Sequence, residues 1–186
     1  MAPPTLRFAD LVRLLTRPSR AVVLIDGGSG SGKSVFAGRL ADAWPRGVQV
    51  VSLDALYPGW DGLAAGSAAV PALTRPDAPG YRAWDWAAAA PGRVVPLDPR
   101  VDLIVEGCGA LTPTNRRLAT AGVWLDLDAS QRRLRALARD GETFAPHWER
   151  WAAQERAHWA ANRPADLADV VVAGERITTR HLDWAE

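Results

Sequence analysis

Residues 25–34 of this chain read Ile-Asp-Gly-Gly-Ser-Gly-Ser-Gly-Lys-Ser and contain the pattern Gly-x4-Gly-Lys-Ser, which is typical of phosphate-binding loops. A chain of average composition and this length contains the pattern by chance only about 1% of the time. Lys33 is the only lysine of the chain, and all other cationic side chains, histidines aside, are arginines. The motif therefore predicts a nucleotide-binding loop rather than a simple glycine- and serine-rich turn.

The sequence patterns on either side of this loop are those of the strand and the helix that flank a phosphate-binding loop. Residues 21–25 form a continuous apolar run typical of a buried strand, and residues 35–43 have the pattern of a helix. Glycines tolerate the dihedral angles that turn successive backbone amides toward one anion at the start of a helix. The residues expected to bind the nucleotide are Gly27, Gly28, Ser29, Gly30, Ser31, Gly32, Lys33 and Ser34.

The chemistry of the loop indicates ATP and Mg²⁺ as cofactors. The Lys33 ammonium is expected to reach the β- and γ-phosphates, and the Ser34 hydroxyl is expected to coordinate Mg²⁺. GTPases, ATPases and kinases share such a loop, so it predicts nucleotide binding more firmly than it predicts one reaction.

Four further short apolar runs follow, at residues 48–53, 101–105, 123–127 and 170–172. Helical stretches separate most of them, and an amphipathic helix is expected before the first strand, at residues 8–15. Together with residues 21–25, the runs predict a five-stranded parallel sheet covered by helices on both faces. Ligands of such sheets bind beyond the carboxyl ends of the strands, where three of the runs are followed by Asp54, Glu106 and Asp128.

Two of these strand-end carboxylates are candidates for chemistry. A carboxylate beside the phosphate loop can accept a proton from an acceptor hydroxyl, orient an attacking water or hold Mg²⁺ through its waters. The alternatives are an N-cap or turn role for Asp54 and a solvated strand end for Glu106. Asp128 precedes a helical run, which favours an N-cap role.

Length and charge narrow the class of protein. A chain of 186 residues is long enough for one domain, residues 1–186, with one core. The net charge of +1 excludes a strong global field for nucleic acid or an anionic membrane. The chain has one cysteine, no signal-peptide pattern and no apolar run of about 18 residues. We expect a cytoplasmic protein whose partner is a small-molecule phosphate acceptor, and its oligomeric state stays open.

The helix predicted from about residue 130 carries a row of arginines on one face, because Arg132, Arg135 and Arg139 have i, i+3, i+7 spacing. A phosphoryl transferase needs cations that close over the nucleotide, so residues 130–160 are predicted to form a lid with residues 140–143 at its tip. A solvated basic face is the alternative. The next predicted helix, residues 146–162, has a stripe typical of core packing, formed by Trp148, Trp151, Glu155, His158 and Trp159.

Residues 55–100 are rich in glycine, proline and alanine and have weak helix signals at residues 63–73 and 83–90. We expect this long segment to cover the substrate. Packing or turn roles are the alternative for its polar and aromatic residues. The candidates for the acceptor pocket are Asp54, Tyr57, Tyr81, Asp85 and Trp86.

With these residues in place, the sequence resembles the uridine kinase-like branch of P-loop kinases, in particular small actinobacterial P-loop proteins. The resemblance rests on the loop, on residues 52–57, on residues 105–107 and on the arginine row that ends in Asp140. It implies a three-layer α/β/α fold with strand order 2-3-1-4-5. It also implies that Asp54 serves as the base and binds the acceptor sugar.

The function expected from the residues and the resemblance is ATP-dependent phosphoryl transfer to a hydroxyl of a small molecule, a nucleoside in the first place. A nucleoside monophosphate kinase, or a phosphotransferase acting on another metabolite or an antibiotic, is the alternative among enzymes. A nucleotide-binding regulatory protein that transfers no phosphate is the alternative outside them. The expected catalytic residues are Asp54, Lys33, Arg135 and Arg139, and the expected Mg²⁺ ligands are Ser34 and Glu106.

Overall fold

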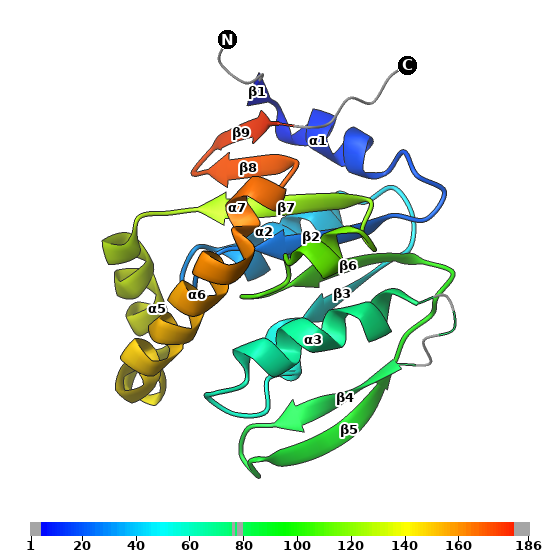
Figure 1. Cartoon of the computed structure of the whole chain (residues 1–186). Helices are drawn as coiled ribbons and strands as arrows, with labels where there is room; N and C mark the ends of the chain where they lie inside the picture. Colours follow the sequence, from blue (N-terminus) through cyan, green and yellow to red (C-terminus); the bar gives the residue numbers. More distant parts are fainter. Residues whose placement is uncertain (1–4, 76, 78–79, 181–186) are drawn as a thin grey trace.

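Five parallel strands form the centre of the structure, a computed structural model that describes residues 5–75, 77 and 80–180. Two antiparallel strands extend this sheet beyond β8, so that its order is β1-β9-β8-β7-β2-β6-β3 (Figure 1). The strands are β1 (Thr5–Leu6), β2 (Val22–Asp26), β3 (Val48–Ser52), β6 (Asp102–Glu106), β7 (Ala121–Asp126), β8 (Val170–Ala173) and β9 (Arg176–Thr179).

The prediction of a five-stranded, wholly parallel sheet is wrong, because the sheet has seven strands and is mixed. The difference lies at one edge: β9 folds back on β8 through Gly174 and Glu175, and β1 pairs with β9. The five predicted strands neighbour one another in parallel, in the order β3-β6-β2-β7-β8. The two-residue strand β1 is too short to have a periodic signal, since it is defined by its partner rather than by its own residues.

The central strands separate two hydrophobic cores, which makes the fold a three-layer α/β/α arrangement. Every residue of β2 is buried, as expected of a parallel strand covered on both faces. Because side chains alternate along a strand, Val22 and Leu24 belong to the core that also contains residues of α3 and α6. Val23 and Ile25 belong to the core that contains residues of α1 and α2.

The helices predicted around residues 8–15, 35–43, 63–73, 130 and 146–162 are present in the outer layers, some with ends shifted by about two residues, and the short α4 and α7 were not predicted. In Figure 1, α3 and α6 lie in front of the sheet and α2 lies behind it. No helix in the described residues has the length and apolar character needed to span a bilayer. The helices are α1 (Phe8–Leu15), α2 (Lys33–Asp42), α3 (Leu63–Thr74), α4 (Pro113–Arg116), α5 (Ala129–Phe144), α6 (Trp148–Asn162) and α7 (Pro164–Leu167), with short 3-10 turns η1 (Leu53–Ala55) and η2 (Ala145–His147).

A β-hairpin stands apart from the main sheet, formed by β4 (Gly80–Asp85) and β5 (Ala90–Pro96) and seen below α3 in Figure 1. The helix predicted at residues 83–90 is therefore wrong. The Asp85 carboxylate accepts hydrogen bonds from the backbone N–H groups of Ala87 and Ala88. The alanine-rich residues therefore form a turn and not a helix. An aspartate that accepts from nearby backbone amides competes with the hydrogen bonds of a helix.

The amino-terminal edge of the sheet is held by a buried carboxylate. Asp102 accepts hydrogen bonds from Ala21 N at 2.8 Å, Trp44 Nε1 at 2.7 Å and Arg46 Nε at 2.6 Å. Burial alone raises the pKa of Asp102, but the bonds from Arg46, Trp44 and Ala21 outweigh it, so the pKa lies below its ordinary value. These three donors stabilise the negative charge of Asp102 at the amino-terminal ends of the strands, away from the phosphate loop.

Candidate active site

The phosphate loop occupies residues 27–34, between the end of β2 and the start of α2, as predicted. Helix α2 begins at Lys33, and its N-cap residue Gly32 has a φ of 97°, in the left-handed region. The Lys33 Nζ donates a hydrogen bond to Gly28 O at 3.2 Å and lies 3.4 Å from the Cys108 Sγ. The ammonium therefore lies over the loop, next to the segment that follows β6.

The charge of Lys33 is maintained although its side chain is only 8% exposed. Burial lowers the pKa of Lys33, but Cys108 and the carboxylates of Glu106, Glu155 and Asp54 raise it by more. Burial also raises the pKa of the Cys108 thiol well above its ordinary value. Because the thiol is then neutral at neutral pH, the carboxylates supply the attraction that keeps the ammonium protonated.

Ser34 and Glu106 meet at the end of the loop, where the Ser34 Oγ donates a hydrogen bond to Glu106 Oε1 at 3.0 Å. Hydroxyl and carboxylate oxygens suit Mg²⁺, which usually takes few protein ligands and completes its shell with water and phosphate oxygens. No group of three or more His, Cys, Asp or Glu within the described residues could hold a metal ion. The Ser34 hydroxyl and the Glu106 carboxylate are oxygen donors of the kind that Mg²⁺ takes.

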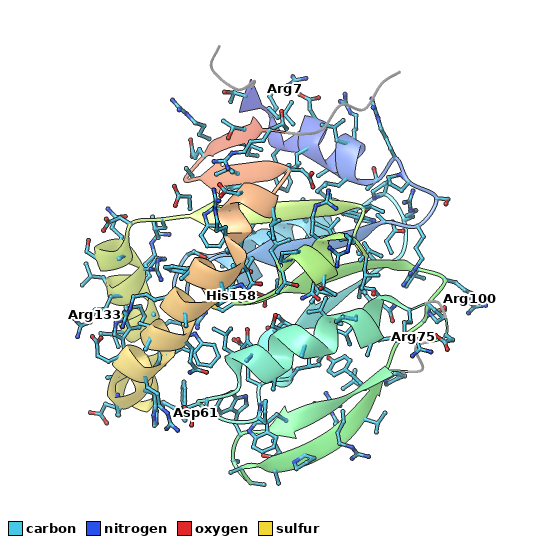
Figure 2. The ribbon with its side chains drawn as sticks, viewed as in Figure 1. Arg7, Asp61, Arg75, Arg100, Arg133 and His158 are labelled. Carbon is cyan, nitrogen blue, oxygen red and sulfur yellow. The ribbon has the colours of Figure 1, made fainter. Side chains whose placement is uncertain are left out.

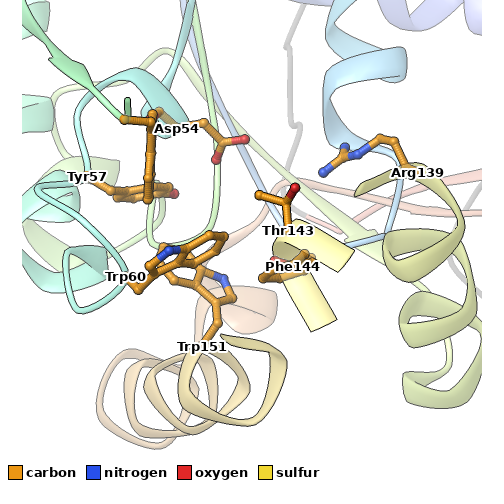
Figure 3. A pocket seen from close by; sticks show the side chains of 9 residues that line it. Asp54, Tyr57, Trp60, Arg139, Thr143, Phe144 and Trp151 are labelled. Carbon is orange, nitrogen blue, oxygen red and sulfur yellow. The ribbon is translucent and has the colours of Figure 1, made fainter. Parts of the chain in front are cut away.

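A cavity of about 450 Å³ opens beside the loop on the side of Asp54. Its polar lining is at one end, and five aromatic rings form much of the rest (Figure 3). The lining residues are Ser29, Asp54, Tyr57, Trp60, Trp86, Arg139, Thr143, Phe144 and Trp151.

A second cavity, of about 360 Å³, lies on the other side of the loop. Its walls come from the loop, from α2, from the ends of β7 and β8, and from α5. The arginines on its walls are Arg39, Arg135 and Arg139. Apolar walls beside a phosphate loop suit the base of a nucleotide, and arginines suit its phosphates.

A small cavity of about 50 Å³ lies over the loop itself, where Lys33, Ser34, Glu106 and Cys108 face it. It shares Ser29 and Asp54 with the cavity of aromatic rings, and Gly30, Gly32 and Val35 with the second cavity. Arg139 lines all three. The three cavities are thus neighbours around the phosphate loop, and each shares lining residues with the next.

Asp54 lies in η1, directly after β3, at the junction of two of these cavities. The N-cap of the turn is Ser52, whose Oγ accepts a hydrogen bond from Asp54 N at 3.4 Å, so Asp54 is not itself the capping side chain. Trp86 Nε1 donates to Asp54 O at 2.9 Å. In Figure 3 the Asp54 carboxylate points into the cavity, opposite the Arg139 guanidinium.

Two of the four residues predicted for the acceptor pocket in the 55–100 segment reach the cavity. Tyr57 lines it, and its hydroxyl donates to Cys108 O at 2.8 Å. Trp86 lines it next to Asp54. Tyr81 instead packs against the core under α3, and Asp85 forms the hairpin turn. The structure brings neither Tyr81 nor Asp85 to this cavity.

The remaining aromatic walls had no specific signal in the sequence. Trp60 stacks on Phe144 with ring centroids 5.4 Å apart, and Trp151 packs against Tyr57 at 4.8 Å. Trp151 belongs to the helical stripe that predicts core packing, and it is indeed buried in the core. It lines the cavity as well, because the α6 face that packs on the core ends where the cavity begins.

The arginine row divides into two roles. Arg135 and Arg139 line the cavities, whereas Arg132 is buried and forms an ion pair with Glu155 at 3.2 Å. Helix α5 bends at Gly141, which has φ 52° and ψ −132°, and the side chain of Asp140 lies outside the described part. Arg133 is on the outer side of α5 (Figure 2).

The N-cap role predicted for Asp128 is confirmed, because its carboxylate accepts a hydrogen bond from Ser130 N at 2.8 Å. This cap fixes the start of α5 directly after β7. Helix α5 therefore starts at the carboxyl ends of the strands, which brings Arg135 and Arg139 to the cavities.

No protein-family model matches this sequence, and no curated protein matches it. Among solved structures, a protein from Bacillus stearothermophilus described as a possible uridine kinase is similar, with a TM-score of 0.61 and 20% identity over 88% of this chain and 94% of that one. A candidate fructose transport system kinase from Silicibacter sp. TM1040 has a TM-score of 0.53 and 18% identity over 87% and 92% of the two chains. These similarities show that the chain has the P-loop kinase fold that its motifs predict.

Proposed function

We propose that this protein transfers the γ-phosphoryl group of ATP to a hydroxyl of a small molecule that carries a flat ring, with a nucleoside as the first candidate. The observation that carries the proposal is the set of three neighbouring cavities around the phosphate loop. Asp54 lines both the aromatic cavity and the cavity over the loop, and Arg139 lines all three. Phosphoryl transfer requires a donor and an acceptor on opposite sides of one phosphorus atom, and this arrangement supplies both sides.

On the donor side, the loop amides and Lys33 bind the phosphates, and the second cavity binds the base. Ser34 and Glu106 would hold Mg²⁺, which would supply positive charge to neutralise the phosphates. Lys33 enters the reaction as a preorganised cation, because the nearby carboxylates of Glu106, Glu155 and Asp54 favour its charged form. Such fixed charges stabilise a transition state without reorganisation.

On the acceptor side, Asp54 accepts the proton of the attacking hydroxyl. The acceptor oxygen forms a bond to the γ-phosphorus while the bond from that phosphorus to the bridging oxygen of ADP breaks. Arg135 and Arg139 stabilise the charge that is shared between the transferred group and ADP. Residues 130–160 serve as the lid that holds these arginines over the nucleotide, with the bend at Gly141 as its tip.

The aromatic walls favour an acceptor that has a ring. The aromatic side chains of Trp60, Phe144 and Trp151 line the cavity, where Trp60 stacks on Phe144. The polar side chains of Asp54, Ser29 and Thr143 line it as well and suit a reacting hydroxyl. Stacking on aromatic side chains stabilises flat rings such as nucleobases. The description of two similar structures as kinases supports the same class of reaction.

A coupled ADP-release screen tests the proposal. The purified protein is incubated with Mg-ATP or Mg-GTP and with nucleosides, nucleoside monophosphates and free sugars, and calorimetry measures nucleotide binding in parallel. We expect ADP release with a nucleoside and weaker release with free sugars. Binding of Mg-ATP without release with any acceptor would refute the transfer reaction and favour a nucleotide-binding regulatory protein.

A further inference from the structure

One residue of the phosphate loop is held at both of its backbone polar groups by side chains from two distant helices. Ser29 N donates a hydrogen bond to Glu155 Oε1 at 2.6 Å, and the Arg132 guanidinium donates to Ser29 O at 3.3 Å. The same guanidinium nitrogen pairs with Glu155 Oε2 at 3.2 Å. Arg132 belongs to α5 and Glu155 to α6.

This ion pair is buried and has further polar partners. Glu155 is 1% exposed and Arg132 is 7% exposed. The Cys108 thiol donates to Glu155 Oε1 at 3.2 Å, and Arg132 Nε donates to Leu127 O at 3.2 Å. A buried ion pair stabilises a fold only when its geometry is good and its other hydrogen-bonding groups are satisfied. The pair matches the polar groups of Ser29, because the carboxylate accepts from the amide N–H and the guanidinium donates to the carbonyl.

Two glycines of the loop allow Arg132 to come this close. A Cβ atom at Gly28 would lie 2.1 Å from an Arg132 guanidinium nitrogen, and a Cβ atom at Gly30 would lie 2.1 Å from the Arg132 backbone oxygen. Because the Arg132 oxygen that faces Gly30 belongs to the backbone of α5, it cannot move aside as a flexible side chain can. The glycines at positions 28 and 30 therefore serve the docking of α5 on the loop.

We propose that Glu155 and Arg132 form a clamp on Ser29. Both are positioning residues that hold the phosphate loop in a fixed place relative to the acceptor cavity. Ser29 lines both that cavity and the cavity over the loop, so its position sets the distance between donor and acceptor. The inference rests on the proposed phosphoryl transfer. The pair fixes α5, which carries Arg135 and Arg139, and α6, which carries the cavity wall Trp151, to the same point of the loop.

The cost of losing this register is large because transfer depends on alignment. A displacement of about 1 Å at a reacting group can lower a rate by about 100-fold. Nucleotide binding depends less on Ser29, since Lys33, Ser34 and the other loop amides contact the phosphates in the proposed mechanism. Loss of the clamp is therefore expected to lower kcat and to leave nucleotide affinity nearly unchanged.

The test compares Glu155→Gln with Glu155→Ala. Glutamine keeps an oxygen that can accept from Ser29 N but removes the charge that pairs with Arg132, and alanine removes both. We expect kcat to fall about 10-fold in the first variant and about 100-fold in the second, with the Kd for Mg-ATP changed less than about 3-fold. Hydrogen exchange in a peptide covering residues 26–33 is expected to become at least about 10-fold faster in the alanine variant.

Asp169→Asn is the matched control. Asp169 is also buried, accepts from Gly122 N at 2.7 Å and pairs with Arg116 at 2.7 Å, at the opposite edge of the sheet. Its substitution is expected to lower Tm as the Glu155 substitutions do, without changing kcat or loop exchange at temperatures where the protein is folded. Equal kcat and equal loop exchange in the Glu155 and Asp169 variants would overturn the proposal.

Two features keep the result decisive. If Glu155→Ala does not fold, Glu155→Gln and Arg132→Lys are measured alone; lysine keeps the charge of Arg132 but loses the planar fork that reaches Ser29 O and Leu127 O. Hydrogen exchange and Mg-ATP binding need no acceptor. A wild-type protein without transferase activity would refute the proposed function, whereas unchanged loop exchange in all variants would refute the clamp.

Discussion

Asp102, at the amino-terminal ends of the parallel strands, has different surroundings from Asp54 and Glu106, which follow or end strands at the opposite side of the sheet. At the amino-terminal edge, Asp102 accepts hydrogen bonds from a backbone amide, an indole and a guanidinium. At the carboxyl-terminal edge, the Asp54 carboxylate faces a cavity, and Glu106 faces the loop beside Ser34. A carboxylate surrounded by its donors contributes to folding, whereas one that faces open space is available for a ligand, a metal ion or a proton.

The same difference appears in the cations. Arg46 and Arg116 form ion pairs with Asp102 and Asp169 and also donate to backbone carbonyls, so each guanidinium is held by several partners. Lys33 lies near three carboxylates that raise its pKa, yet its Nζ contacts only a carbonyl and a sulfur among the hydrogen bonds found in the described residues. The ammonium is therefore charged and close to the surface on which phosphates are expected.

Groups at the carboxyl-terminal ends of the strands are expected to act on catalysis, and groups at the amino-terminal ends on stability. The largest effect is expected for Lys33→Ala. Turnover should fall by about 1,000-fold, because a preorganised charge at the reacting phosphate is removed. Added Mg-ATP should no longer raise the Tm, as measured by thermal unfolding. Arg133→Ala, on the outer side of α5, serves as the control and should retain both properties; an unchanged Tm shift in the Lys33 variant would contradict the role of the loop.

Asp54→Asn is expected to have the next largest effect. Turnover should fall by at least about 100-fold while the Kd for Mg-ATP stays nearly unchanged, because the change removes a base and leaves the nucleotide site intact. Steady-state kinetics and calorimetry measure the two quantities. Asp85→Asn, in the hairpin turn, should change turnover by less than about 3-fold, and a full rate in the Asp54 variant would exclude it as the base.

Asp102→Asn should act on stability instead of catalysis. The free energy of unfolding is expected to fall by about 2 kcal/mol, since hydrogen bonds to a charged group are lost or weakened while Arg46 is partly exposed to water. Urea denaturation measures this change. Turnover per folded molecule should be unchanged, and a loss of turnover without a loss of stability would show that the two edges are not independent.

The smallest expected effect is the pH dependence of that difference. The folded pKa of Asp102 lies below its ordinary value of 3.8, so its contribution is present above the unfolded pKa and is lost as the pH falls through the folded one. Urea denaturation of the wild type and Asp102→Asn between about pH 6 and pH 3 should therefore show a stability difference that narrows in acid. A difference that widens in acid would reverse the assigned direction of the pKa shift.

Local features of the chain could be predicted where neighbouring residues act together. The loop, the helix predicted at residues 35–43 and found at residues 33–42, and the N-cap Asp128 each depend on residues within a few positions of one another. The hairpin could not be predicted, because the alanines of residues 87–90 favour a helix locally but Asp85 and the pairing with β5 give a turn. The helical preference of these alanines is weak, because a helix of so few residues is not stable by itself. Pairing of β4 with β5 satisfies backbone hydrogen-bonding groups on both sides of the turn instead.

The phosphate loop and the carboxylates after the strands could be identified from residue order, because a glycine pattern and an apolar run followed by an acid are local in the chain. The aromatic cavity and the clamp on Ser29 could not. Glu155 is 126 positions from Ser29, and its place in a buried helical stripe is equally consistent with packing. Its contact with the loop exists because α5 and α6 fold back over the edge of the sheet, and the distance between such segments is set by packing of the whole molecule.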